Sequence, residues 1–152
     1  MSAHPFLLEL AAESGCGDLT ACGEALERAR AAQQSAVGIL LDEKLVDEKS
    51  FLRTLSERIG LPWRDEAEEG SADMSVPAPL REKFPPRLAL RYHLFPAALD
   101  EERSELTLLT YDPFNTLARQ AVAQAIPERI RWEMSTRRGI LLGLRQGYGV
   151  GA

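Results

Sequence analysis

Between residues 5 and 60, apolar residues recur every three or four positions, which is the spacing of one face of an α-helix. The clearest case is the stretch 37–63, where two apolar faces flank a short polar corner. The faces are formed by Val37, Leu40 and Leu41 before the corner and by Phe51, Leu52, Leu55 and Ile59 after it. This pattern predicts two short helices that share one small core.

The second of these helices carries a start signal and a stop signal. Asp47 is suited to accept hydrogen bonds from the first backbone N–H groups, and Glu48 suits the positive end of the helix dipole. Gly60 and Pro62 follow the last apolar position, Ile59. We therefore expect the helix to begin just after Asp47 and to end near Ile59.

A similar helix pair precedes this one, because residues 5–32 are helical in pattern and are interrupted by a corner at residues 15–17. A shift of 29 positions superimposes four residues of the first pair on four of the second. It places Asp18 on Asp47, Cys22 on Phe51, Leu26 on Leu55 and Leu10 on Ile39. We interpret this as a degenerate internal repeat; chance similarity between two amphipathic helix pairs is the alternative.

After residue 63 the helical spacing is lost in an acidic run, and prolines then occur at positions 77, 79, 85 and 86. Pro85 or Pro86 is suited to open a short helix through Leu88, Leu90 and Tyr92. Segments 94–99 and 105–111 predict a β-hairpin around the polar turn 100–104. Segment 129–134 alternates polar and apolar residues and predicts a third strand, with its core face formed by Ile130, Trp132 and Met134.

Two helices complete the pattern. Asp112 and Pro113 favour a helix start after the second strand, with Asp112 as the cap. The expected packing face consists of Leu117, Ala118, Ala121, Val122 and Ala125. The last helix is expected over 136–148, with Ile140, Leu141, Leu144 and Tyr148 in line.

The predicted fold class is α+β. A helical subdomain of two helix–corner–helix units (1–63) and an acidic linker (64–76) precede a small three-stranded sheet packed with helices (77–148) and a flexible tail (149–152).

Composition and charge limit the classes of function and partner that we expect for this chain. The chain of 152 residues is 45% apolar and 27% charged, which is typical of a globular protein. Residues 1–76 hold 7 Lys and Arg against 15 Asp and Glu, and residues 77–152 hold 11 against 8. Because phosphate binding needs a concentrated positive surface, nucleic acid is not an expected partner. The sequence lacks a signal-peptide pattern and an apolar run long enough to cross a bilayer, so we expect a cytoplasmic protein without direct membrane insertion.

Catalytic and metal-binding patterns are sparse. His4 lies near the terminus and His93 follows a predicted helix, so both favour structural roles. Cys16 and Cys22 match no zinc or CxxC spacing and are expected to be plain thiols. The spacing of metal ligands and the phosphate-binding loop are both missing, so we expect no metal and no cofactor. Asp112 is the only residue whose position suggests a catalytic role, and a role as a helix cap explains that position better.

Glycine inside a helix costs about 1 kcal/mol relative to alanine, so Gly38 predicts a close approach to its backbone. A neighbouring helix is one candidate for that approach, and a ligand is the other.

Four stretches together resemble a known family. They are Gly60-Leu-Pro-Trp63 after the second helix pair, residues 88–96 followed by residues 106–113, and Gln146-Gly-Tyr-Gly149 at the end. In this order, over most of the chain, they are similar to the N-terminal domain of type II secretion and type IV pilus assembly ATPases, the GspE-like, MshEN-related family. The resemblance implies a non-catalytic docking domain that links a motor ATPase to the cytoplasmic domain of a GspL-like inner-membrane platform protein. It also implies a motor ATPase domain in cis if the chain is a fragment, and a location peripheral to the inner membrane through the partner.

Some members of that family bind cyclic di-GMP through two helix units, each of which begins Arg-Leu-Gly and ends in glutamine. In this chain Gly38 keeps its position, while Arg58 stands at the glutamine and Lys44 at the corner glycine. Because the arginine is missing from both copies, we predict no binding of cyclic di-GMP. A nucleotide sensor with a degenerate site is the alternative function. As partner-contact residues we expect Leu7, Leu8 and Arg53, because each lies on a predicted helix with more apolar or charged surface than we expect it to bury.

Overall fold

The computed structural model describes residues 4–64 and 78–148. The chain divides into two compact units, Met1–Gly60 and Leu61–Ala152, which we call the helical unit and the sheet unit. Residues 65–77 and 149–152, which include nearly all of the predicted linker and the whole predicted tail, lie outside the described residues.

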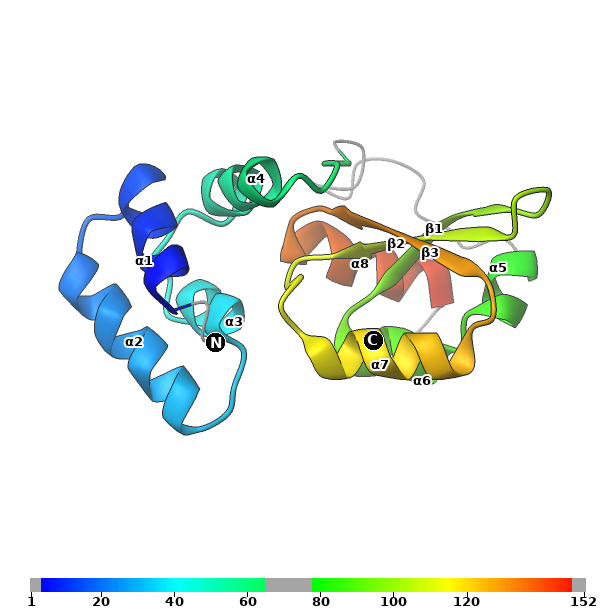
Figure 1. Ribbon diagram of the computed structural model, residues 1–152, viewed down its shortest axis with the longest axis horizontal. Coiled ribbons are helices and arrows are strands. Elements are labelled where there is room, and N and C mark those ends of the chain that lie inside the picture. The colour runs from blue at the N-terminus through cyan, green and yellow to red at the C-terminus, as the bar shows by residue number, and fades with distance from the viewer. Residues whose placement is uncertain (1–3, 65–77, 149–152) are drawn as a thin grey trace. The chain divides into compact units, whose positions relative to one another are not determined.

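The helical unit consists of α1 (His4–Glu13), α2 (Leu19–Ala31), α3 (Ala36–Asp42) and α4 (Glu48–Ile59) (Figure 1). Helix α1 packs against the other three helices, and α2 also packs against α3. The large side chains with no exposed surface at the centre of this unit are Leu7, Leu10, Leu40, Phe51, Leu52 and Leu55. The apolar residues that recur at helix spacing in the sequence therefore form one small core, which the four helices share.

The two helix pairs repeat in their caps and corners. The Asp18 carboxylate accepts a hydrogen bond from the Ala21 N–H at 3.0 Å, and 29 residues later the Asp47 carboxylate accepts one from the Ser50 N–H at 3.0 Å. Gly15 and Lys44, also 29 positions apart, both have a left-handed backbone, with φ of 91° and 55°. The two helix pairs thus share their cap and corner geometry at a spacing of 29 residues, which agrees with the interpretation as a repeat.

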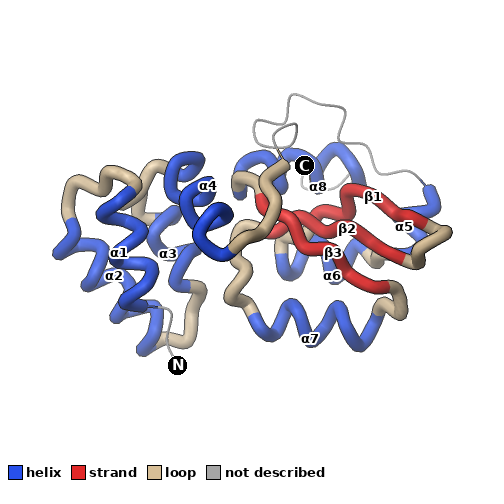
Figure 2. The backbone as a smooth tube through the Cα atoms, turned by 45° about the horizontal axis from the view of Figure 1, so that its top comes forward, coloured by secondary structure: helices blue, strands red, loops and turns tan. Residues whose placement is uncertain are grey.

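The sheet unit contains three strands and four helices (Figure 2). In chain order they are α5 (Ala78–Lys83), α6 (Pro86–Tyr92), β1 (Phe95–Asp100), β2 (Glu105–Thr110), α7 (Thr116–Ala125), β3 (Arg129–Met134) and α8 (Arg137–Tyr148). The sheet order is β1-β2-β3; β1 is antiparallel to β2, and β2 is parallel to β3 with α7 in the connection.

Helix α8 packs against β1 and β2, and α6 packs against α7 and α8. The buried cluster that these elements enclose includes Phe84, Leu94, Leu106, Leu108, Leu109, Val122, Ile140 and Leu144. The α+β class and the three-stranded sheet are as predicted from the sequence.

The stretch that follows α4 joins the free edge of β3. The Met134 N–H donates to the Pro62 carbonyl at 2.8 Å, and the Arg64 N–H donates to the Met134 carbonyl at 3.0 Å. Trp63 and Met134 therefore form a parallel bridge. This pairing assigns residues 61–64 to the sheet unit, whereas the sequence had suggested the helical subdomain through residue 63.

Two sequence predictions about α7 were wrong, and one helix was missed. Helix α7 begins at Thr116 with Asn115 as its cap, because the Asn115 side chain accepts the Ala118 N–H at 3.0 Å. Asp112 instead accepts the Phe114 N–H at 3.2 Å and closes a turn before the helix. Leu117 was placed on the packing face, yet its side chain is 68% exposed. Helix α5 was not predicted, since its segment lies among prolines.

Smaller corrections concern individual faces. Ala125 and Leu141 are exposed, although the pattern placed both on packing faces. On β3, Met134 is buried as expected, while Ile130 and Trp132 are only half-buried. Both still pack against the buried cluster of the sheet unit.

Candidate interaction surface

The sequence placed a degenerate nucleotide position at Gly38, which lies in the first turn of α3. Its N–H donates to the Ser35 hydroxyl at 2.8 Å, which makes Ser35 the cap of α3. A Cβ added at Gly38 would lie 3.1 Å from both Cβ and Oγ of Ser35. The close approach to Gly38 is therefore made by the helix's own cap residue, Ser35.

Arg58, the second degenerate position, lies in the last turn of α4. Its guanidinium forms an ion pair with the Glu13 carboxylate at the end of α1. Arg58 and Gly38 thus have different partners, Glu13 and Ser35, and these contacts do not bring the two residues into one site. Lys44, at the corner glycine position, has a left-handed backbone with φ of 55°, so the corner keeps its shape without glycine.

The three residues expected at a partner surface have different environments. Leu7 has no exposed surface and belongs to the core of the helical unit, so the apolar excess that we inferred for it does not exist. Leu8 is half-buried and Arg53 is exposed. A helix phase that buries Leu7 and Leu10 leaves the neighbouring position 8 at the edge of the core. Leu8 and Arg53 therefore remain accessible candidates.

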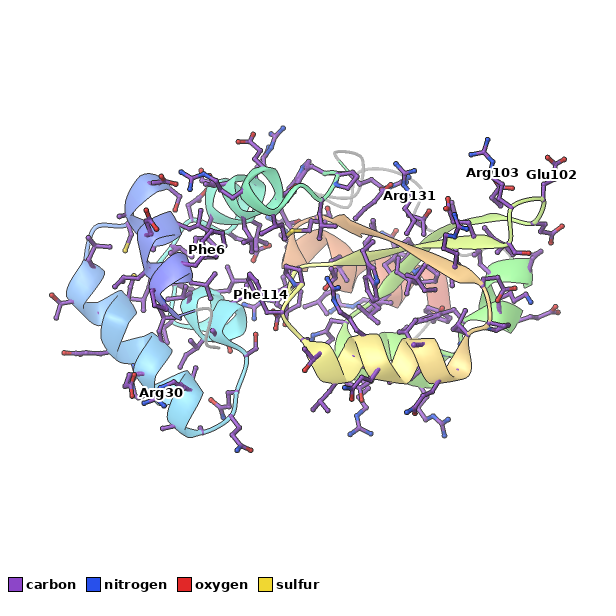
Figure 3. The ribbon with its side chains drawn as sticks, viewed as in Figure 1. Phe6, Arg30, Glu102, Arg103, Phe114 and Arg131 are labelled. Carbon is purple, nitrogen blue, oxygen red and sulfur yellow. The ribbon has the colours of Figure 1, made fainter. Side chains whose placement is uncertain are left out.

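The most exposed large apolar side chain among the described residues is one that the sequence had assigned to the core. Leu117, in the first turn of α7, is 68% exposed, and Phe114 in the preceding loop is 38% exposed. Figure 3 shows Phe114 projecting from the loop between β2 and α7. The turn closed by Asp112 and the cap at Asn115 hold this segment in place. We call Phe114 and Leu117 the α7 apolar pair.

Charged side chains secure the edge of β3. The Glu133 carboxylate, with a side chain only 8% exposed, accepts hydrogen bonds from Nε of Arg64 at 2.8 Å and Nε of Arg131 at 3.0 Å. A buried carboxylate needs such partners, because burial without them costs several kcal/mol. Glu133 was not singled out from the sequence, since Arg64 lies 69 positions away.

The end of β2 carries an aromatic and cationic cluster. The rings of His93 and Tyr111 stack with centroids 6.1 Å apart, and the Arg137 guanidinium lies 5.6 Å from the Tyr111 ring centre. Burial, and to a lesser degree the charge of Arg137, lower the pKa of His93 below its usual range. A neutral imidazole packed on a ring agrees with the structural role expected for His93.

A groove lies between α5 and β1. It has a volume of about 620 Å³ and is lined by Pro79, Leu80 and residues 97–102. Its rim carries three carboxylates, those of Asp100, Glu101 and Glu102, the last of which is visible near the hairpin tip in Figure 3.

Within residues 4–64 and 78–148, no group of three or more His, Cys, Asp or Glu side chains is arranged to hold a metal ion. None of the helices described over those residues is both long enough and apolar enough to cross a bilayer.

The element order defines the class of the protein: an α+β domain in which paired helices precede a small mixed sheet covered by helices. The family model of the MshEN domain matches residues 59–151. Because this match covers more than half of the chain, the protein belongs to the MshEN domain family, as the sequence motifs had suggested.

Solved structures share the fold. The chain is similar to a structure of the N-terminal domain of XpsE with 23% identity and a TM-score of 0.77, covering 98% of each chain. A second crystal form of that domain gives 24% identity and a TM-score of 0.64, over 97% of this chain and 98% of that one. A structure of MshE with cdg gives 18% identity and a TM-score of 0.67, over 93% and 98%. The chain matches no curated protein sequence.

Proposed function

We propose that this chain is a non-catalytic docking domain of a secretion or pilus assembly motor ATPase. In this role it links the motor to the cytoplasmic domain of a GspL-like inner-membrane platform protein. The observation that carries the proposal is the MshEN family match over residues 59–151, supported by the fold shared with the N-terminal domain of XpsE. The domain then works in the cytoplasm, next to the inner membrane, through its partner.

Two surfaces are candidates for the platform protein. The first is the accessible part of the helical unit at Leu8 and Arg53. The second is the α7 apolar pair, Phe114 and Leu117, on the sheet unit. Protein interfaces bury apolar anchors at their centres, and an exposed leucine in a fixed helix is such an anchor. Leu7 is left out of both surfaces because its side chain is fully buried.

Isothermal titration calorimetry of the chain with the platform protein's cytoplasmic domain tests the proposal. Variants of the chain then show which of the two surfaces binds. Leu117→Asp removes the anchor of the second surface, and Arg53→Glu reverses the charge of the first. We expect the variant on the true surface to weaken binding about tenfold or more, because burying an exposed leucine is worth roughly 1.5–3 kcal/mol. Leu19→Asp is the matched control, since Leu19 is a similarly exposed helix leucine at 44%. No heat of binding with the unaltered chain would refute the docking role.

A nucleotide sensor is the second candidate function. It is favoured by the fold that the chain shares with the structure of MshE with cdg. The contacts around the degenerate positions argue against it: the Ser35 hydroxyl already accepts the Gly38 N–H, and Glu13 forms an ion pair with Arg58. We therefore predict no heat of binding when cyclic di-GMP is titrated at micromolar concentration. A saturable heat that Gly38→Ala abolishes would move the sensor function ahead of docking.

A further inference from the structure

Two thiols meet at the corner of the first helix pair. Cys16 lies in the corner between α1 and α2, and Cys22 lies in the first turn of α2. Their sulfur atoms are 2.8 Å apart, and both cysteines are free. We propose that Cys16 and Cys22 form an oxidation site, at which a peroxide or a small-molecule disulfide such as oxidised glutathione converts the two thiols into an intramolecular disulfide.

The corner can bring the sulfurs into bonding distance with little movement. A disulfide needs about 2.05 Å between sulfurs, so the required approach is below about 1 Å. Both cysteines are held by their backbones: the Cys16 N–H donates to the Ala11 carbonyl at 2.9 Å and the Cys22 N–H to the Asp18 carbonyl at 3.1 Å. The glycines on either side of Cys16 have open space around the position of an added Cβ. The backbone on either side of Cys16 therefore has room for a small shift.

The two thiols have different exposure, and this sets their roles. Cys16 is half-buried, whereas Cys22 has no exposed surface. An oxidant in solution can therefore reach Cys16 and not Cys22. Burial, together with the contact to Cys16, raises the pKa of the Cys22 thiol to about 12, so Cys22 stays protonated at neutral pH. Cys16 is accordingly the attacking sulfur, and Cys22 is the resolving one.

The reaction balances in two steps. With oxidised glutathione, the Cys16 thiolate attacks one glutathione sulfur, a mixed disulfide forms, and one glutathione thiolate leaves. The Cys22 sulfur then attacks the Cys16 sulfur, and the proton of the Cys22 thiol passes to the departing glutathione sulfur, so that the second glutathione leaves as a thiol. The two protein thiols have given up two electrons, and the oxidised glutathione has taken them up.

The second helix pair has apolar residues at the two positions that the cysteines occupy in the first pair. A shift of 29 positions places Leu45 and Phe51 at the positions of Cys16 and Cys22. Leu45 is half-buried and Phe51 is fully buried, so both pairs combine a rim position with a core position. The first pair fills the same two positions with thiols, which can be linked covalently. A transient disulfide of this kind is the form in which reducing compartments use cysteine pairs.

The test treats the full chain with oxidised glutathione, alkylates the remaining thiols under denaturing conditions and measures the intact mass. We expect a monomer that has lost two hydrogens, takes up no alkyl group and returns to the dithiol form with dithiothreitol. The melting temperature of the oxidised chain should rise by roughly 5–10 °C, because the link constrains the unfolded chain. In the Cys22→Ser variant, which lacks the resolving thiol, a glutathione adduct should persist on Cys16.

Three results would overturn the proposal. The first is an unaltered chain that still takes up two alkyl groups after the treatment. The second is an unaltered chain that keeps one glutathione on Cys16 while Cys22 is alkylated. The third is the formation of disulfide-linked dimers in place of the intramolecular bond. All three are observed with the unaltered protein, so they hold even if a serine variant fails to fold.

Discussion

The corner glycine of the first helix pair and the corner lysine of the second should respond in opposite ways to substitution. Gly15 has φ of 91° and Lys44 has φ of 55°. An L-residue in the left-handed region loses roughly 1–2 kcal/mol, which glycine does not. Glycine in turn gives the unfolded chain about 0.4–1 kcal/mol more conformational freedom than alanine does. The folded and unfolded terms therefore oppose each other in each variant.

The difference between the strain in the folded chain and the entropy term of the unfolded chain gives the expected change in the free energy of unfolding. Lys44→Gly should raise the free energy of unfolding by about 0.5–1 kcal/mol, and Gly15→Ala should lower it by about 0.5–1.5 kcal/mol. No atom lies within 4 Å of an added Cβ at Gly15, so backbone strain alone sets that loss. Gly17→Ala is the matched control: it lies in the same corner with equally open space, but its φ is not in the left-handed region.

Urea unfolding followed by far-ultraviolet circular dichroism measures these changes. Trp63 and Trp132 both belong to the sheet unit, so tryptophan fluorescence follows that unit in the same samples. We expect the midpoint from circular dichroism to rise for Lys44→Gly, to fall for Gly15→Ala, and to rise for Gly17→Ala, which restricts the unfolded chain without straining the folded one. A loss of stability in Lys44→Gly, or equal effects of the two alanine substitutions, would refute the reasoning.

Two further predictions concern burial and pH. Leu7→Ala should lower the free energy of unfolding by about 2–4 kcal/mol, since it empties a fully buried position, and Leu8→Ala at the core edge by about 1 kcal/mol. Equal losses in a urea titration would show that the assigned helix phase is wrong. Because the pKa of His93 is lowered in the folded chain, the unfolded chain takes up a proton at a higher pH than the folded one does. Stability should therefore be complete above the ordinary histidine pKa of 6.5 and should fall as the pH drops below it. His93→Asn, which tolerates the left-handed φ of 53°, should show a smaller decline between neutral pH and pH of about 5. An unchanged pH profile would remove His93 as the cause.

Local signals predicted the helical unit well. The caps at Asp18 and Asp47 and the stop at Gly60 each act within one turn of a helix, so residue type and spacing are enough to place them. The same is true of β3, whose predicted bounds 129–134 match the strand. These features need no knowledge of the rest of the chain.

The parts that the sequence did not predict depend on contacts made at a distance. Asp112 and Asn115 are both good caps three residues apart, and the packing of Ala118 and Val122 decides which of them starts α7. Leu117 was expected in the core because it lies four positions before Ala121, whereas the buried face of α7 is centred on Ala118 and Val122. Leu7 and Leu8 are likewise neighbours of the same residue type, and tertiary packing alone separates them. For the same reason the docking residues remain a proposal.

One measurement tests the docking role of the chain most directly. The unaltered chain and the cytoplasmic domain of a GspL-like platform protein are mixed at micromolar concentration and passed over a size-exclusion column. We predict that they elute together as one complex, earlier than either protein alone. Separate elution of the two folded proteins even at high micromolar concentration would contradict the docking function.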